Sequence, residues 1–187
     1  MVYYRKESDT LTRKDGKVKL EILTRHILSR DITQNLLSVQ KLVRYLDGKL
    51  QIEQTVLVDH YQRGIGRSHT EILRSVKPRG DYVFILDDDD VVVNLMQWGE
   101  LAEVLNGKPE VVSVGMKHRE GILPVDSEST GHGTRGISSV IVKSTVFDMA
   151  KFMFAESYDG AWPFIHEALL YRYIIFTNLI LSMELES

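Results

Sequence analysis

The sequence contains no cysteine, and it has no long run of apolar residues without polar interruptions. Without thiols the chain has neither a disulfide framework nor a thiolate metal site, which fits the reducing cytoplasm. Its most apolar stretch, 168–183, is interrupted by Arg172 and Asn178 and falls short of the roughly 20 clean apolar residues of a spanning helix. We interpret that stretch as a buried helix leading into a buried strand. Residues 1–16 are polar and mixed in charge, unlike a signal peptide or an anchor, so we expect a cytoplasmic protein without a transmembrane segment.

Several ligand-binding signatures are missing as well. The six histidines have no zinc-type spacing, and no phosphate-binding loop ending in Gly-Lys-Ser/Thr occurs. The segment 131–136 matches the pattern G-x-G-x-x-G, but a strand-like run follows it where a dinucleotide site needs a helix. A net charge of −3 gives no electrostatic reason to expect a nucleic-acid partner. These observations disfavour a Rossmann dehydrogenase, a P-loop kinase and a nucleic-acid-binding protein.

Apolar runs of strand length alternate with segments of helical period, which is typical of an α/β protein. The 187 residues and their ordinary balance of apolar and charged side chains indicate a single domain, 1–187, whose first 16 residues or so are a polar extension. Strand–helix–strand order with short connections predicts a three-layer α/β/α domain with a mainly parallel central sheet. We expect strands at 19–24, 54–59, 82–86, 111–116 and 137–143, and helices at 32–46, before Pro78, at 95–105, at 144–154 and from about Trp162. Residues 119–134 are expected to form a loop.

Polar residues follow each of the first three predicted strands directly. They are Thr24 and Arg25 after the first, Asp59 and His60 after the second, and Asp87 to Asp90 after the third. Ligands of parallel α/β sheets bind beyond the carboxyl ends of the strands. We therefore expect these three groups to meet at one edge of the sheet and to form the binding site.

The four successive aspartates are the most informative feature of the chain. Each pair of like charges about 5 Å apart costs roughly 3 kcal/mol at an effective dielectric near 20, and less when well solvated. Hard divalent ions prefer such oxygen ligands, and residues two apart in an extended chain point the same way, so Asp87 and Asp89 can converge on one ion. A solvated acidic turn is the alternative. The position of the cluster at the end of the apolar run YVFIL favours a site for Mn²⁺ or Mg²⁺.

The motif YVFILDDDD resembles the strand and Asp-x-Asp motif of glycosyltransferases with the GT-A fold, particularly those of family 2. LVDH at 57–60 resembles the acidic motif at the end of that family's second strand, and RGIGRSHTEI resembles its glycine-containing turn before a helix. TRHILSRD, followed by Asn35-Leu36-Leu37-Ser38, resembles its first strand, loop and helix. The resemblance covers about 19–93, with the motifs in the family's order.

The resemblance implies a nucleotide-diphospho-sugar site. Asp59 would contact the base or ribose, and Thr24 and Arg25 would line the nucleotide pocket. The loop after the first strand departs from the family pattern and leaves open which of its arginines serves the nucleotide. Asp87 and Asp89 would match the metal-binding pair, with Asp89 the direct ligand. The nucleotide-binding set is completed by Asp87, Asp88 and Arg67, the last at a predicted helix start where it meets a diphosphate or is simply solvated.

An inverting transferase also needs a general base that accepts the proton of the attacking hydroxyl. In the family this base is an acidic residue just before a late helix. Asp159 and Glu167 are the two candidates, with Asp159 favoured because it precedes the predicted helix. Helix capping is the alternative role for Asp159, and a place on the helix surface is the alternative for Glu167.

The sequence therefore predicts a metal-dependent glycosyltransferase. It would move a sugar from a nucleotide-diphospho-sugar to a glycan, lipid or other hydroxyl acceptor, with inversion. A degenerate domain that binds a nucleotide or glycan without turnover is one alternative. A sugar-phosphate nucleotidyltransferase is another, disfavoured because TRHILSRD lacks the glycines of that class's loop. The oligomeric state is open.

Overall fold

The computed structural model describes residues 16–60, 68–124, 135–154 and 161–185. The polar extension predicted for 1–16 therefore lies outside the described residues, except for its last position. The strands are β1 (Lys19–Ile27), β2 (Gln51–Asp59), β3 (Tyr82–Ile85), β4 (Asp90–Val92), β5 (Val111–His118), β6 (Gly121–Leu123), β7 (Val140–Lys143) and β8 (Ile174–Glu184). The α-helices are α1 (Thr33–Tyr45), α3 (Leu95–Asn106), α4 (Ser144–Ala150) and α5 (Trp162–Ala168). Shorter helical segments are η1 (Ser68–Leu73), η2 (Ile137–Ser139) and η3 (Lys151–Met153).

The strands form one sheet in the order β2-β1-β3-β7-β5-β8-β4, with β6 paired to β5 outside this path. The longest ladders are parallel: β1 pairs with β2 over nine residues, and β5 pairs with β8. β7 runs antiparallel to both β3 and β5, and β4 runs antiparallel to β8. The sheet is therefore mixed, with its longest ladders parallel, which confirms the prediction of a mainly parallel sheet in part.

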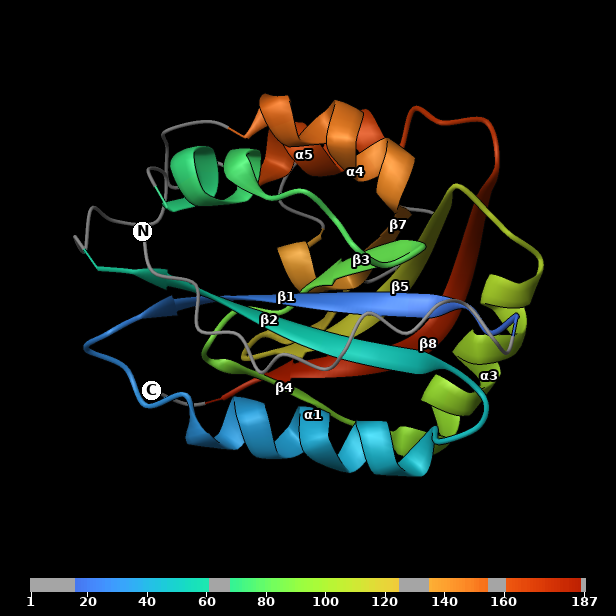
Figure 1. Cartoon of the computed structure of the whole chain (residues 1–187), viewed down its shortest axis with the longest axis horizontal. Coiled ribbons are helices and arrows are strands. Elements are labelled where there is room, and N and C mark those ends of the chain that lie inside the picture. The colour runs from blue at the N-terminus through green and yellow to red at the C-terminus, as the bar shows by residue number, and fades with distance from the viewer. Residues whose placement is uncertain (1–15, 61–67, 125–134, 155–160, 186–187) are drawn as a thin grey trace.

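Helices cover both faces of this sheet (Figure 1), and each face has its own apolar cluster. α1 and α3 pack on one face, where Trp98 is fully buried and meets Phe84 edge-on at 5.6 Å between ring centroids. α4 and α5 pack on the other, where Phe164 stacks on Phe154. The strands curl across Figure 1 rather than forming a flat layer. The fold is thus mixed α/β, with a curled sheet in place of the regular central layer of the predicted sandwich.

Most predicted elements form, and the differences are a longer first strand, two additional short strands and a short helical segment. β1 continues to Ile27 because β2 pairs with it along its whole length, His26 opposite Val58 and Ile27 opposite Asp59. β4 begins with the last residue of the acidic run. Its apolar part is short, so the sequence did not indicate a strand there. β6 lies in the segment predicted to be a loop, and residues 137–139 form η2 ahead of β7. As predicted, the apolar stretch near the C-terminus contains a helix end followed by a strand, α5 and β8, but most residues of β8 are half-buried rather than buried.

Among the helices that the structure describes, none combines the length and the apolar character needed to cross a membrane.

Trp98 allows a direct test of the core between α3 and the sheet. Its indole Nε1–H donates to the Leu181 carbonyl at 3.1 Å. We expect Trp98→Phe to lower the free energy of unfolding by about 1–3 kcal/mol, because it removes one of the two hydrogen bonds to that carbonyl, the other coming from the Val93 N–H at 3.0 Å, and opens a small void. Urea unfolding measures the change. Met96→Leu on the exposed side of the same helix is the control, and equal losses in both variants would contradict the packing described here.

Candidate functional site

The predicted convergence of polar residues at the carboxyl ends of the strands is present. β1, β2 and β3 run parallel, so their last residues share one edge of the sheet. Arg25 on β1 places its Nη2 3.2 Å from Oδ1 of Asp87, which follows β3. Asp59, buried at the end of β2, pairs with Ile27, whose N–H donates to Asp88 at 2.8 Å. Three segments far apart in the sequence thus form one polar site.

The four aspartates form a turn between β3 and β4. The Asp90 N–H donates to the Asp87 carbonyl at 3.0 Å, and the Asp89 carbonyl accepts from the Leu185 N–H at 2.8 Å. The side chains alternate: Asp88 and Asp90 are buried, whereas those of Asp87 and Asp89 are 20% and 28% exposed. The two carboxylates predicted to face one ion are therefore the two that solvent reaches.

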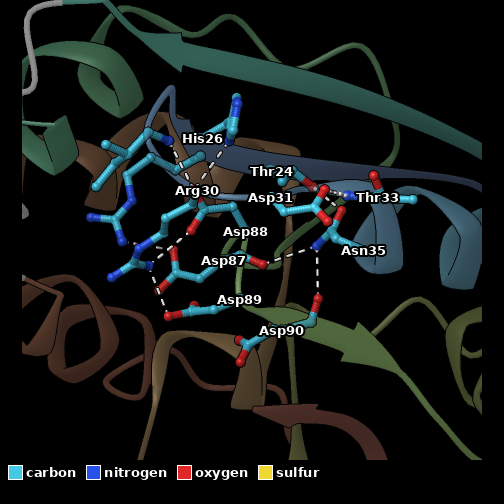
Figure 2. Close-up of polar contacts among 12 residues, drawn as sticks. Thr24, His26, Arg30, Asp31, Thr33, Asn35, Asp87, Asp88, Asp89 and Asp90 are labelled. Atoms are coloured by element: carbon cyan, nitrogen blue, oxygen red, sulfur yellow. Dashed lines mark hydrogen bonds and ion pairs between the residues drawn. The ribbon is translucent and has the colours of Figure 1, made fainter. Parts of the chain in front are cut away.

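The side chain of Asn35, at the start of α1, binds the backbone of this turn (Figure 2). Its amide group donates to the carbonyls of Asp87 at 2.9 Å and Asp90 at 2.8 Å, and the side chain is fully buried. Gln54 on β2 completes the arrangement by donating to the Asn35 Oδ1 at 2.8 Å and to the Thr24 hydroxyl at 2.8 Å. Thr24 is fully buried, so its hydroxyl helps to hold Gln54 and Asn35 in place and does not reach the surface of the site.

Asp88 connects the turn to the loop between β1 and α1. Its Oδ2 accepts from the Ile27 N–H and lies 3.2 Å from the His26 Nδ1, while its Oδ1 accepts from Arg30 at 2.9 Å (Figure 2). Both carboxylate oxygens are thus engaged within the protein. In this arrangement Asp88 positions the loop, and the predicted contact between Asp88 and a nucleotide would require one of these partners to be released.

Burial and mutual repulsion govern the electrostatics of the turn. Burial first, and then the neighbouring charge of Asp87, raise the pKa of Asp90 to about 8, although the Ser138 hydroxyl donates to this carboxylate and opposes the shift. Burial and Asp87 also raise the pKa of Asp89, and Arg30 opposes that rise. For Arg30 itself, burial acts to lower the pKa, but the hydrogen bond to Asp88 and the charge of Asp89 outweigh it and the pKa is raised.

The exposed part of the turn suits a hard divalent cation. Asp87 and Asp89 offer carboxylate oxygens, the ligand type that Mg²⁺ and Mn²⁺ prefer, and such ions complete their coordination with phosphate oxygens and water. The Oδ1 of Asp87 is buried and accepts no hydrogen bond within the described residues, although Arg25 lies 3.2 Å away. The Asp87 Oδ1 can accept a further ligand, and the exposed carboxylate of Asp89 lies two residues away, so this pair suits a divalent ion.

Of the three remaining predicted site residues, the structure describes Glu167 alone. Arg67 and Asp159 lie outside the described residues. Glu167 on α5 helps to raise the pKa of the Tyr171 phenol, after burial and together with Glu110. Glu110 also accepts the N–H of Tyr173, directly before β8 begins. Glu167 therefore lies near the amino ends of β5 and β8, the edge opposite the aspartates.

Sequence reasoning did not single out Asn35, Gln54 or Ser138 as parts of the site. The position of Asn35 could have been recognised from the helical period. It begins the series 35, 39, 42, 46, which contains the buried residues of α1 and its C-cap. A polar residue within a buried helical stripe needs a partner. Leu37 and Val43, two apolar residues of the same helix that lie outside this series, are exposed. Gln54 and Ser138 had no comparable signal.

Comparison with solved structures shows the class of fold to which this architecture belongs. The sheet, with an acidic turn after a central strand, has a glycosyltransferase fold. Comparison with solved structures finds S. aureus TarS. For TarS 1–349 in complex with UDP-GlcNAc the TM-score is 0.61 at 14% identity, covering 90% of this chain and 59% of that one. For TarS 1–349 in complex with UDP the TM-score is 0.59 at 17% identity, covering 90% and 61%.

A crystal structure of TarS with a longer chain gives a TM-score of 0.59 at 17% identity, and the match covers 90% of this chain and 37% of that one. The chain thus spans about three fifths or less of the TarS structures that it matches. No protein-family model matches the sequence, and comparison with curated proteins finds no match. At these identities the likeness shows the fold and does not show membership of family 2.

Proposed function

We propose that the chain is a metal-dependent glycosyltransferase of the family 2 type, which moves a sugar from a nucleotide-diphospho-sugar to an acceptor hydroxyl with inversion. The observation that carries the proposal is the acidic turn at the carboxyl end of β3, with two carboxylates facing solvent, in a chain of this fold. The UDP-GlcNAc and UDP bound by TarS support a nucleotide-sugar donor and make the uridine forms the first to test.

Each group of the site has a role in this proposal. Asp87 and Asp89 would hold Mn²⁺ or Mg²⁺, which when bound neutralises charge that develops on the departing diphosphate. Arg25, paired with Asp87, fixes the orientation of that carboxylate. Asp59, at the end of β2, lies where the base or ribose would be recognised. Asn35 preorganises the turn, because its two hydrogen bonds set the backbone on both sides of the metal ligands.

Asp159 is the general base in this proposal, since Glu167 lies near the opposite edge of the sheet. The base removes the proton of the acceptor hydroxyl as that oxygen attacks the anomeric carbon. We expect Asp159→Asn to abolish transfer while nucleotide binding persists, and Glu167→Gln to retain transfer. Loss of transfer in Glu167→Gln alone would reverse this assignment. A glycan, a lipid or another hydroxyl compound is the acceptor.

The proposal is tested by thermal denaturation with the diphosphates of uridine, guanosine, cytidine, adenosine and thymidine, each with and without Mn²⁺. A ligand at 100 times its dissociation constant adds about 2.7 kcal/mol to the stability of the folded state, an easily measured shift. We expect one nucleotide to stabilise the protein in a metal-dependent way. The matching sugar nucleotide should then be hydrolysed or consumed in transfer.

Binding of that nucleotide without hydrolysis or transfer would identify the alternative, a domain that keeps the fold and binds without turnover. The absence of any nucleotide-dependent shift would leave the acidic turn with a structural role and remove the main support for a transferase.

A further inference from the structure

Arg30 lies directly at the carboxylate that the proposed metal would use. Its Nη1 is 2.8 Å from the Asp89 Oδ2 and 2.9 Å from the Asp88 Oδ1, so one nitrogen bridges two aspartates (Figure 2). The bond to Asp88 is made to a side chain that is completely buried, whereas the bond to Asp89 is exposed. Arg30 therefore has one fixed partner and one partner that solvent reaches.

The two arginines of the site differ in mobility for a physical reason. The Arg25 side chain is 2% exposed and is confined by the sheet beside Asp87. The Arg30 side chain is 39% exposed and comes from the loop between β1 and α1. An exposed ion pair contributes little net stability, so Arg30 can leave Asp89 at small cost, whereas moving Arg25 would uncover a buried charge.

We propose that Arg30 is a positioning residue that competes with the divalent cation for Asp89, an inference that rests on the proposed function. Without the cation, its guanidinium neutralises Asp89 and keeps that carboxylate oriented beside Asp87. When the cation binds, Arg30 gives up its bond to Asp89 and keeps its bond to Asp88. The freed guanidinium nitrogens then face the bound diphosphate, whose oxygens are strong partners for arginine. Cation and nucleotide thus bind cooperatively.

A purely structural role for Arg30 makes the opposite prediction. If the guanidinium only anchored the loop to Asp88, its removal would loosen the turn and leave the affinity for the cation unchanged or weaker. Competition predicts that removing Arg30 strengthens cation binding. The sign of the change distinguishes the two roles.

The experiment is a titration of the full chain with Mn²⁺ alone, in which free Mn²⁺ is measured by electron paramagnetic resonance. We expect Arg30→Gln to bind Mn²⁺ on the order of tenfold more tightly than the unmodified protein, since a charge-assisted hydrogen bond to the ligand is removed. Arg44→Gln, which removes an equal charge from the exposed end of α1, should change nothing. Asp89→Ala should lose Mn²⁺ binding in either background.

Arg30→Lys separates competition from simple repulsion and serves where Arg30→Gln does not fold. Lysine keeps the positive charge but is a shorter point charge that does not reproduce the bridge between the two aspartates. Competition predicts tightening by roughly threefold, and repulsion alone predicts no change.

Two outcomes would overturn the inference in distinguishable ways. Equal or weaker Mn²⁺ binding by Arg30→Gln, with binding by the unmodified protein intact, contradicts competition and leaves the proposed transferase standing. Failure of every variant to bind Mn²⁺, even with nucleoside diphosphates present, removes the metal site itself and the proposed function with it.

Discussion

Asp89→Ala is expected to abolish the metal-dependent stabilisation of the protein by its nucleoside diphosphate while leaving the fold intact. The Asp89 side chain is 28% exposed and bonds to Arg30 at the surface, so its removal costs little folding energy. A divalent ion held by two carboxylates and a diphosphate loses one of its protein ligands. Nucleotide at 100 times its dissociation constant should then give up most of the roughly 2.7 kcal/mol of stabilisation.

The measurement is a melting curve for each protein with nucleotide, with and without Mn²⁺. Asp47→Ala is the matched control, because it removes the same charge from an exposed turn after α1. It should retain the full shift. Equal shifts in both variants and the unmodified protein would show that the nucleotide binds without Asp89, and the metal site would have to be sought elsewhere.

The convergence of three polar segments was predictable because it depends on coarse features. Apolar runs such as YVFIL mark buried strands, and parallel strands with short crossovers must end at the same edge of a sheet. Asp59 and the turn at 87–90 needed no further information to be placed together. The exposure of Asp87 and Asp89 agrees with the alternation expected of an extended chain. In the structure, however, it arises in a turn closed by the Asp90 N–H and the Asp87 carbonyl.

What could not be predicted depends on tertiary partners. A short strand such as β4 has too few apolar residues to be recognised, and it forms because β8, about 90 residues later, pairs with it. The antiparallel entry of β7 between β3 and β5 is likewise set by long-range packing. His26, Ile27 and Arg30 all contact the Asp88 carboxylate, and no local sequence pattern reveals the loop path that brings them there.

The second large effect concerns Asn35, a residue of α1 that contacts the aspartate turn through the backbone of that turn. We expect Asn35→Ala to lower the free energy of unfolding by about 3 kcal/mol or more. It leaves the buried carbonyl of Asp90, the part-buried carbonyl of Asp87 and the Gln54 amide short of partners, and each lost partner costs about 1–3 kcal/mol unless water replaces it. Asn106→Ala, at the exposed end of α3, should cost less than about 0.5 kcal/mol.

Asn35→Asp gives the sharper test because it preserves shape. The aspartate places carboxylate oxygen where an amide donor faced two carbonyls, so repulsion replaces two hydrogen bonds within a buried, already acidic region. It should destabilise the protein at least as much as Asn35→Ala at neutral pH, as measured by urea unfolding. Since the same bonds orient Asp87 and Asp89, both variants should also weaken Mn²⁺ binding under conditions in which they remain folded. Destabilisation with unchanged Mn²⁺ affinity would show that the turn keeps its geometry without α1, and that the helix contributes to the fold but not to the site.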